Sequence, residues 1–110
     1  MEAKIQAATI KLFLPTGEAT GQRSTNGFVV FKGSQAVAKD TPAIPDIVKQ
    51  VRSLLISKNI LVLADGAYQF AYDYEFNSPS LAAGILVAGS ASGPKEWKNK
   101  AGKSLKEIEA

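Results

Sequence analysis

The chain of 110 residues contains no cysteine and no histidine. Without cysteine it can form no disulfide, no thiolate metal site and no cysteine nucleophile. Without histidine it lacks the Ser-His-Asp arrangement, histidine-ligated zinc and the usual general base near neutral pH. Because these absences remove the most common catalytic sets, we expect a protein that is not an enzyme, with no catalytic residue, no cofactor and no metal.

Long apolar runs are also absent. The longest, LAAGILVAG at residues 81–89, is less than half of the roughly 20 residues that a membrane-spanning helix needs. The first thirteen residues carry Glu2, Lys4 and Lys11, which interrupt the apolar core that a signal peptide requires. We therefore expect a cytoplasmic protein with no membrane partner.

The composition is that of one folded, mildly basic domain. Hydrophobic residues make up 45% of the chain, and its length suits a single domain over residues 1–110. Thirteen lysines and arginines outnumber ten acidic residues, and the isoelectric point is near 9.2. Such an excess indicates a nucleic-acid partner only if the cations gather on one face of the fold.

Hydrophobic periodicity predicts the first elements. Residues 8–14 alternate apolar and polar side chains and predict a strand, and GFVVFKG at residues 27–33 predicts a central strand. Pro15 and Gly17 end the first strand, and a polar stretch rich in glycine and threonine follows to Asn26. Residues 44–59 predict an amphipathic helix with Lys49 and Arg52 on its solvent face. Its apolar stripe consists of Ile44, Ile47, Val48, Val51, Leu54 and Leu55.

The second half of the chain predicts a hairpin, a buried helix, a short strand and a final helical turn. Asp65-Gly66 is a two-residue turn signal, and aromatic residues continue a strand from Tyr68 to Phe76. A helix begins at Ser78-Pro79, a short strand surrounds Trp97, and a last helical turn has capping-box spacing. The order β-β-α-β-β-α-β predicts an α+β fold, with a mostly antiparallel sheet of about five strands and two main helices.

A cluster of lysines around the single tryptophan is the first candidate site. Cations around an exposed aromatic ring can hold a nucleic-acid strand by charge and stacking. The alternative is that the tryptophan anchors the core, and Glu96, Glu107 and Glu109 dilute the positive charge. The candidate nucleic-acid-binding residues are Lys32, Lys95, Trp97, Lys98 and Lys100.

Two further groups can be interpreted in two ways. Ser78 and Ser80 stand at a predicted helix N-terminus, where free N–H groups favour an anion, but capping the helix is the usual role of such a serine. Asp73 and Glu75 share a strand face and would suit acid–base chemistry in a pocket, whereas the commoner role is a solvated surface. The sequence AGKS at residues 101–104 is no phosphate-binding loop, because Trp97 stands where that motif needs glycine.

Several blocks of sequence occur together in a known order. They are GFVVFKGS at residues 27–34, DYEFNSPSLAA at residues 73–83, and a stretch from Gly89 through Trp-Lys to GKSL, which ends at Leu105. Over residues 27–105 the chain resembles an uncharacterised bacterial domain family, best known at the C-terminus of GIY-YIG nuclease-like and restriction-modification-associated proteins. That family has no established activity, so the resemblance implies a context of nucleic-acid processing.

These observations lead to two functional hypotheses. The first is a non-catalytic accessory module that binds or targets DNA or RNA during DNA processing. The alternative is a protein-interaction or oligomerisation module with no nucleic-acid role, in which the aromatic strand from Tyr68 to Phe76 lies at a sheet edge and pairs with another protein.

Overall fold

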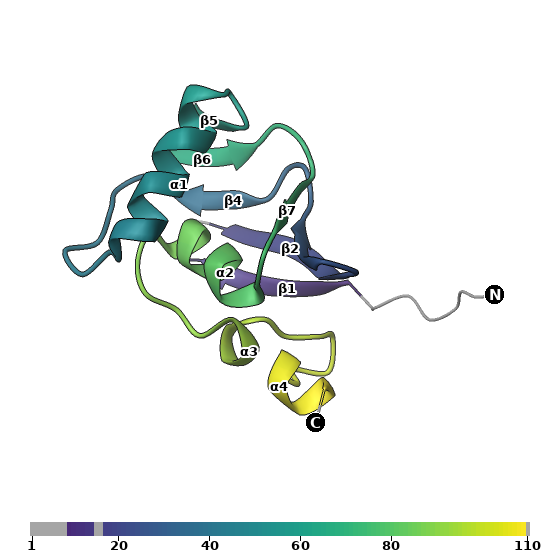
Figure 1. The fold of residues 1–110 in the computed structure, drawn as a ribbon. Helices are drawn as coiled ribbons and strands as arrows, with labels where there is room; N and C mark the ends of the chain where they lie inside the picture. The colour runs from purple at the N-terminus through teal and green to yellow at the C-terminus, as the bar shows by residue number, and fades with distance from the viewer. Residues whose placement is uncertain (1–8, 15–16, 110) are drawn as a thin grey trace.

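The structure is a computed structural model and describes residues 9–14 and 17–109. Along these residues four strands come first, then one helix, three more strands and three helices (Figure 1). The strands are β1 (Ile10–Leu14), β2 (Gly17–Ser24), β3 (Gly27–Val30), β4 (Gln35–Val37), β5 (Leu61–Ala64), β6 (Ala67–Phe70) and β7 (Tyr74–Phe76). The helices are α1 (Asp46–Ser57), α2 (Pro79–Val87), α3 (Gly93–Glu96) and α4 (Leu105–Ile108).

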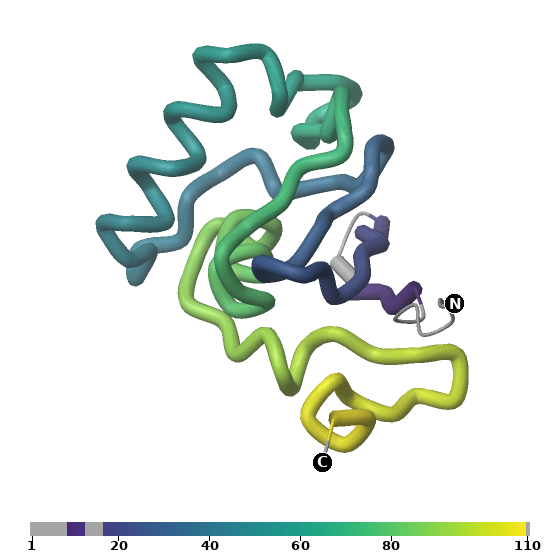
Figure 2. Tube along the Cα trace, turned by 45° about the vertical axis from the view of Figure 1, so that its right-hand side comes forward, coloured from purple at the N-terminus to yellow at the C-terminus, as the bar shows by residue number. Residues whose placement is uncertain are grey.

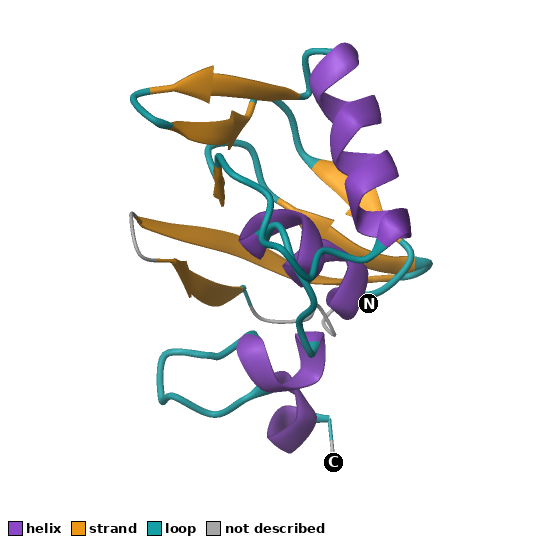
Figure 3. Cartoon of the chain, turned by 90° about the vertical axis from the view of Figure 1, so that its left-hand side faces the viewer, coloured by secondary structure: helices purple, strands orange, loops and turns teal. Residues whose placement is uncertain are grey.

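The strands make two antiparallel sheets. One has the order β1-β2-β3-β7, and the other has the order β4-β6-β5. The β5–β6 hairpin and the pair of short helices α3 and α4 lie at opposite ends of the molecule (Figures 1 and 3). The predicted α+β class and the antiparallel pairing are therefore confirmed, whereas the single sheet of about five strands is wrong.

Helix α2 occupies the centre of the fold, between α1, the two sheets and α3 (Figure 2). Its residues Ala82 to Leu86 are all buried, as expected for a helix that is apolar on every side. Around it lies one continuous core that includes Leu12, Phe28 and Trp97. In the described part of the chain, no helix combines the length and the apolar character that a membrane crossing requires.

Most of the predicted local signals are confirmed. Asn59 ends the α1 region with a positive φ of 58°, and Asp65-Gly66 forms the turn between β5 and β6. Ser78 caps α2 by accepting a hydrogen bond from the amide of Leu81 at 3.1 Å. Ser104 forms the predicted capping box at the start of α4. Local chemistry therefore fixes the ends of these elements.

The sequence does not reveal the two sheets, because the side-chain patterns of two segments indicate a different structure from the one that they form. The polar residues 17–24 predict no strand, yet they form β2, whose buried positions hold only Ala19 and Gly21. At Gly21 a Cβ atom would stand 2.5 Å from the carbonyl oxygen of Val29, so the close pairing of β2 with β3 needs glycine.

The aromatic stretch was predicted as one strand from Tyr68 to Phe76, and this prediction is wrong. The chain leaves the strand after Phe70, and Tyr72 turns outward with 62% of its surface exposed. β6 therefore lies in the centre of one sheet and β7 at the edge of the other. The short strand predicted around Trp97 is also wrong: α3 precedes this residue, and the pairing that follows it consists of isolated bridges from Lys98 to Lys11 and Ser104.

Candidate functional site

A groove lined by three lysines forms where the 98–104 loop meets β1. Lys11 and Lys98 exchange two backbone hydrogen bonds, each 2.8 Å long. Figure 2 shows this part of the C-terminal segment beside the start of the chain's first strand. The groove has a volume of about 430 Å³. We call it the lysine groove; it is lined by Thr9, Lys11, Lys98, Asn99, Lys100 and Gly102.

The 98–104 loop holds its shape through one side chain. The Asn99 side-chain oxygen accepts hydrogen bonds from the amides of Ala101 at 2.9 Å and Lys103 at 3.0 Å. Gly102 has a φ of +81°, a conformation that glycine adopts without strain. The loop therefore places Lys98 and Lys100 at fixed points along the groove wall.

The groove brings like charges together. Residues that exchange both backbone hydrogen bonds lie directly opposite each other in an antiparallel pair, about 5.5 Å apart at Cα, with side chains on one face. Lys11 and Lys98 stand in this relation, and like charges in such positions destabilise a sheet. Lys11 also pairs with Glu18 at 3.0 Å, but both groups are half exposed, so this pair screens the charge only partly.

Nearby acidic groups are held by internal partners. Glu109 accepts two hydrogen bonds from Arg23, at 2.8 and 3.0 Å, and these raise the pKa of the guanidinium. Hydrogen bonds from the backbone and hydroxyl of Ser104, helped by the charges of Lys103 and Lys98, lower the pKa of Glu107. Neither Lys98 nor Lys100 has an ion-pair partner within residues 9–14 and 17–109.

The structure separates the predicted nucleic-acid-binding residues. Lys98 and Lys100 line the lysine groove, while Lys95 on α3 and Lys32 after β3 are exposed but do not line it. Lys11 was not among the predicted residues, because nothing in the sequence indicates that β1 lies beside the 98–104 loop.

The prediction for Trp97 is corrected, because its side chain is 0% exposed. Its ring packs against Phe28 with the centroids 4.5 Å apart, and its indole N–H donates to the carbonyl oxygen of Pro79 at 3.1 Å. A ring buried in this way cannot stack on a base. The alternative weighed for it, an anchor in the core, is the one that the structure shows.

The serines at the start of α2 serve internal contacts. Ser78 caps the helix, and the Ser80 hydroxyl accepts a hydrogen bond from the amide of Gly93 at 3.1 Å. The chain crosses here so closely that a Cβ atom on Gly93 would stand 2.2 Å from the carbonyl carbon of Pro79. Capping is thus observed for Ser78, and anion binding at these two serines stays a prediction without a supporting contact.

The two carboxylates of the predicted aromatic strand are exposed. Asp73 accepts a hydrogen bond from the backbone amide of Lys32 at 2.7 Å, and Glu75 accepts one from the Ser24 hydroxyl. Within the residues described, no three histidine, cysteine or acidic side chains gather as metal ligands would. These two carboxylates tie neighbouring segments together at the surface.

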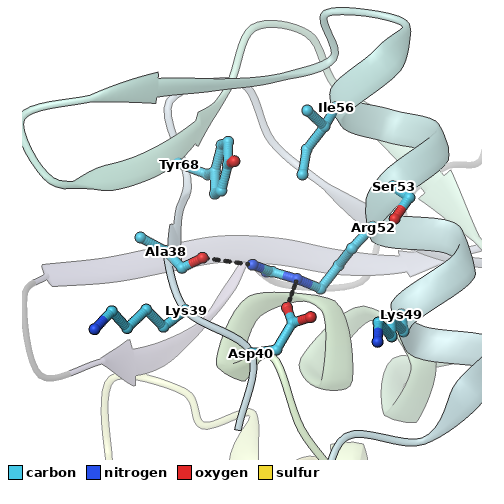
Figure 4. Close-up of a pocket in the computed structure, with 8 residues that line it drawn as sticks. All are labelled: Ala38, Lys39, Asp40, Lys49, Arg52, Ser53, Ile56 and Tyr68. Atoms are coloured by element: carbon cyan, nitrogen blue, oxygen red, sulfur yellow. Dashed lines mark hydrogen bonds and ion pairs between the residues drawn. The ribbon is translucent and has the colours of Figure 1, made fainter.

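A second pocket surrounds a buried arginine that the sequence placed on the solvent face of α1. Arg52 is only 3% exposed, and its guanidinium lies between α1, α2 and the end of β4 (Figure 4). The pocket has a volume of about 400 Å³. We call it the Arg52 pocket; it is lined by Ala38, Lys39, Asp40, Lys49, Arg52, Ser53, Ile56 and Tyr68.

The Arg52 guanidinium is held mainly by carbonyl oxygens. It donates to Ile85 at 2.7 Å, to Val37 at 2.9 Å and to Ala38 at 3.3 Å. Its Nε lies 3.3 Å from a carboxylate oxygen of Asp40, and its charge lies 5.7 Å from the centre of the Tyr68 ring. Burial lowers the pKa of this guanidinium, and the Asp40 charge partly offsets that effect.

One protein family matches most of the chain. A family described as a domain of unknown function, DUF4357, matches residues 11–109. The chain belongs to this family. No curated protein and no solved structure matches it significantly. The expected membership of an uncharacterised domain family is thus confirmed, and the association with GIY-YIG and restriction-modification proteins stays a prediction.

Proposed function

We propose that this domain is a non-catalytic module that binds nucleic acid through its phosphates, with the lysine groove as the contact surface. The observation that carries the proposal is the convergence of Lys11, Lys98 and Lys100 on one groove from segments far apart in sequence. Two of these lysines oppose each other across a β-bridge, and a phosphate between them would offset their repulsion.

The character of the groove defines the kind of binding. Its three lysines are the charged residues of a lining that is otherwise mostly apolar, and no aromatic ring lines it among the described residues. Ammonium groups in such a groove contact phosphates and carry no base information. We therefore propose binding that is largely independent of sequence, with DNA and RNA as related ligands.

The first prediction concerns salt. If the three lysines of the groove neutralise about three phosphates, the logarithm of the binding constant for a short DNA duplex should fall with the logarithm of salt concentration at a slope of about −2 to −3. Fluorescence anisotropy between about 50 and about 200 mM salt measures this slope. Replacing both Lys98 and Lys100 with glutamine should make the slope shallower by about 2.

The matched control is Lys58→Gln, which removes one exposed lysine after α1, outside the groove, and should leave the slope nearly unchanged. Absence of binding, or an affinity that does not respond to salt, contradicts the proposal. An equal loss in the control and in the double variant would show attraction to overall charge instead of to the groove.

The second candidate function is protein interaction, and one observation favours it on a different surface from that predicted. β5 is an edge strand, and its side chains Val62 and Leu63 are 43% and 59% exposed. An edge with unpaired backbone groups and exposed aliphatic side chains can add a strand from another chain. Helix α1 contacts β5, and its Leu54 is also exposed.

This candidate predicts self-association through β5. Light scattering should show a molar mass that rises with protein concentration, and Leu63→Lys should return it to that of a monomer, because a charged edge strand resists pairing. Tyr72→Lys is the control, since it adds the same charge at an exposed residue outside β5. A strictly monomeric parent chain at high concentration would rule this candidate out.

A further inference from the structure

We propose that the Arg52 pocket binds the phosphate monoester of a small organic molecule. The pocket shares no lining residue with the lysine groove, so the inference does not depend on the proposed nucleic-acid binding. It depends on the charge of the pocket, on the way its arginine is held and on the character of its walls.

The lining of the Arg52 pocket carries a net positive charge. Three cations, Lys39, Lys49 and Arg52, line the pocket together with one carboxylate, Asp40. Two positive charges are therefore left without a counter-charge in its lining. A phosphate monoester carries a charge of about −1.5 to −2 near neutral pH and matches this excess, whereas a monocarboxylate would balance only half of it.

The Arg52 side chain in this pocket is held rigidly. Bonds to the carbonyl oxygens of Ile85, Val37 and Ala38 fix the guanidinium of Arg52, which is one of the lining residues of the pocket. A guanidinium fixed in this way is already ordered before any anion arrives, so binding loses little side-chain freedom.

Asp40 is the ion-pair partner of Arg52, and it balances the charge of the guanidinium only in part. Asp40 reaches Arg52 with one oxygen at 3.3 Å, and its side chain is itself 41% exposed. A buried cation is costly unless it is well paired, so a bound anion would stabilise this charge further. Figure 4 shows Asp40 below the guanidinium, between the side chains of Lys39 and Lys49. In this view the Lys39 side chain extends away from that contact, and Lys49 lies on the side of α1 (Figure 4).

The walls of the Arg52 pocket are partly apolar. Tyr68 and Ile56 stand on the other side of the guanidinium from Asp40 and present a ring and an aliphatic side chain (Figure 4). The hydroxyl of Ser53 adds a donor. A volume of about 400 Å³ lies in the range of small-ligand sites, roughly 300–1,000 Å³. The pocket thus combines an anion site with an apolar wall, which suits a monoester whose organic part contains a ring.

The test uses the full chain and three simple probes. Phenyl phosphate, inorganic phosphate and benzoate are titrated separately against isotopically labelled protein, and amide shifts are followed by NMR. Phenyl phosphate should shift the amides of residues 38–40, 49–56 and 68, and it should bind more tightly than inorganic phosphate because its ring contacts Tyr68. Benzoate should bind about tenfold more weakly, because it carries one charge where the pocket has two to offset.

Two substitutions separate a binding site from a merely structural arginine. Lys49→Gln should weaken phenyl phosphate binding about tenfold. Asp40→Asn keeps an oxygen that can accept from Arg52 but removes the competing charge, so it should tighten binding about fivefold. Lys58→Gln, directly after the same helix and outside the pocket, should change nothing.

A gain in affinity cannot arise from partial unfolding, so Asp40→Asn keeps the test valid even if another variant is unstable. The proposal is overturned if millimolar phenyl phosphate leaves the amides of the pocket unshifted. It is also overturned if Asp40→Asn, folded as judged by its spectrum, binds more weakly than the parent chain.

Discussion

Trp97→Ala is expected to lower the free energy of unfolding by about 3–5 kcal/mol, the range for removing a large aromatic side chain from a core. The ring is 0% exposed and packs against Phe28, and its N–H satisfies the carbonyl oxygen of Pro79. The residue also joins the short helices to the core, because its backbone oxygen accepts from Leu105 and its amide donates to Gly93. Since domains of this size are stable by about 5–15 kcal/mol, the loss would be a large part of the total.

Urea denaturation followed by circular dichroism measures this loss. Trp97→Phe should cost less than Trp97→Ala, because it keeps a ring and loses chiefly the indole hydrogen bond. Lys95→Ala is the matched control two residues away, and an exposed position of this kind should change stability by no more than about 0.5 kcal/mol. A stable Trp97→Ala variant with impaired nucleic-acid binding would instead restore the stacking role predicted from the sequence.

Arg52→Met is expected to cost about 2–4 kcal/mol. Methionine and arginine have similar helix propensity, so the change leaves α1 itself nearly unaffected. What is lost is the donor set at the centre of the fold, because the carbonyl oxygens of Ile85 and Val37 then lack their partner, and each unsatisfied buried group costs about 1–3 kcal/mol.

Chemical denaturation of Arg52→Met beside Lys49→Met checks this expectation. Lys49 lies on the same helix and is exposed, so its replacement should leave stability within about 0.5 kcal/mol of the parent chain. Equal stability of the two variants would show that Arg52 contributes only as a surface charge. Arg52→Lys should fall between them, because a single ammonium group cannot reproduce the fork of donors.

Elements with strong local signals were predictable from the sequence. Each of these signals depends on residues that are close together in the sequence. They are the period of apolar residues in α1, the Asp65-Gly66 turn, Ser78 before Pro79, and the spacing of Ser104 and Glu107. Such short-range chemistry is visible in a sequence because it needs no knowledge of the rest of the fold.

What could not be predicted depends on distant pairing. β2 buries small residues against β3, so its pattern lacks the large apolar side chains that mark a strand. Arg52 falls beside the apolar stripe of α1, and only the position of α2 and the end of β4 shows that its guanidinium has buried carbonyls to satisfy. Likewise, Lys11 joins the lysine groove only because the 98–104 loop crosses β1.

Contact between nucleic-acid phosphates and the lysine groove can be observed by NMR, in a titration of isotopically labelled protein with a short DNA duplex at low salt that maps the amide shifts. We expect shifts at Thr9, Lys11 and residues 98–102, which are lost when Lys98 and Lys100 are both replaced by glutamine. Shifts confined to α1 and β5, or no shifts at all, would contradict it.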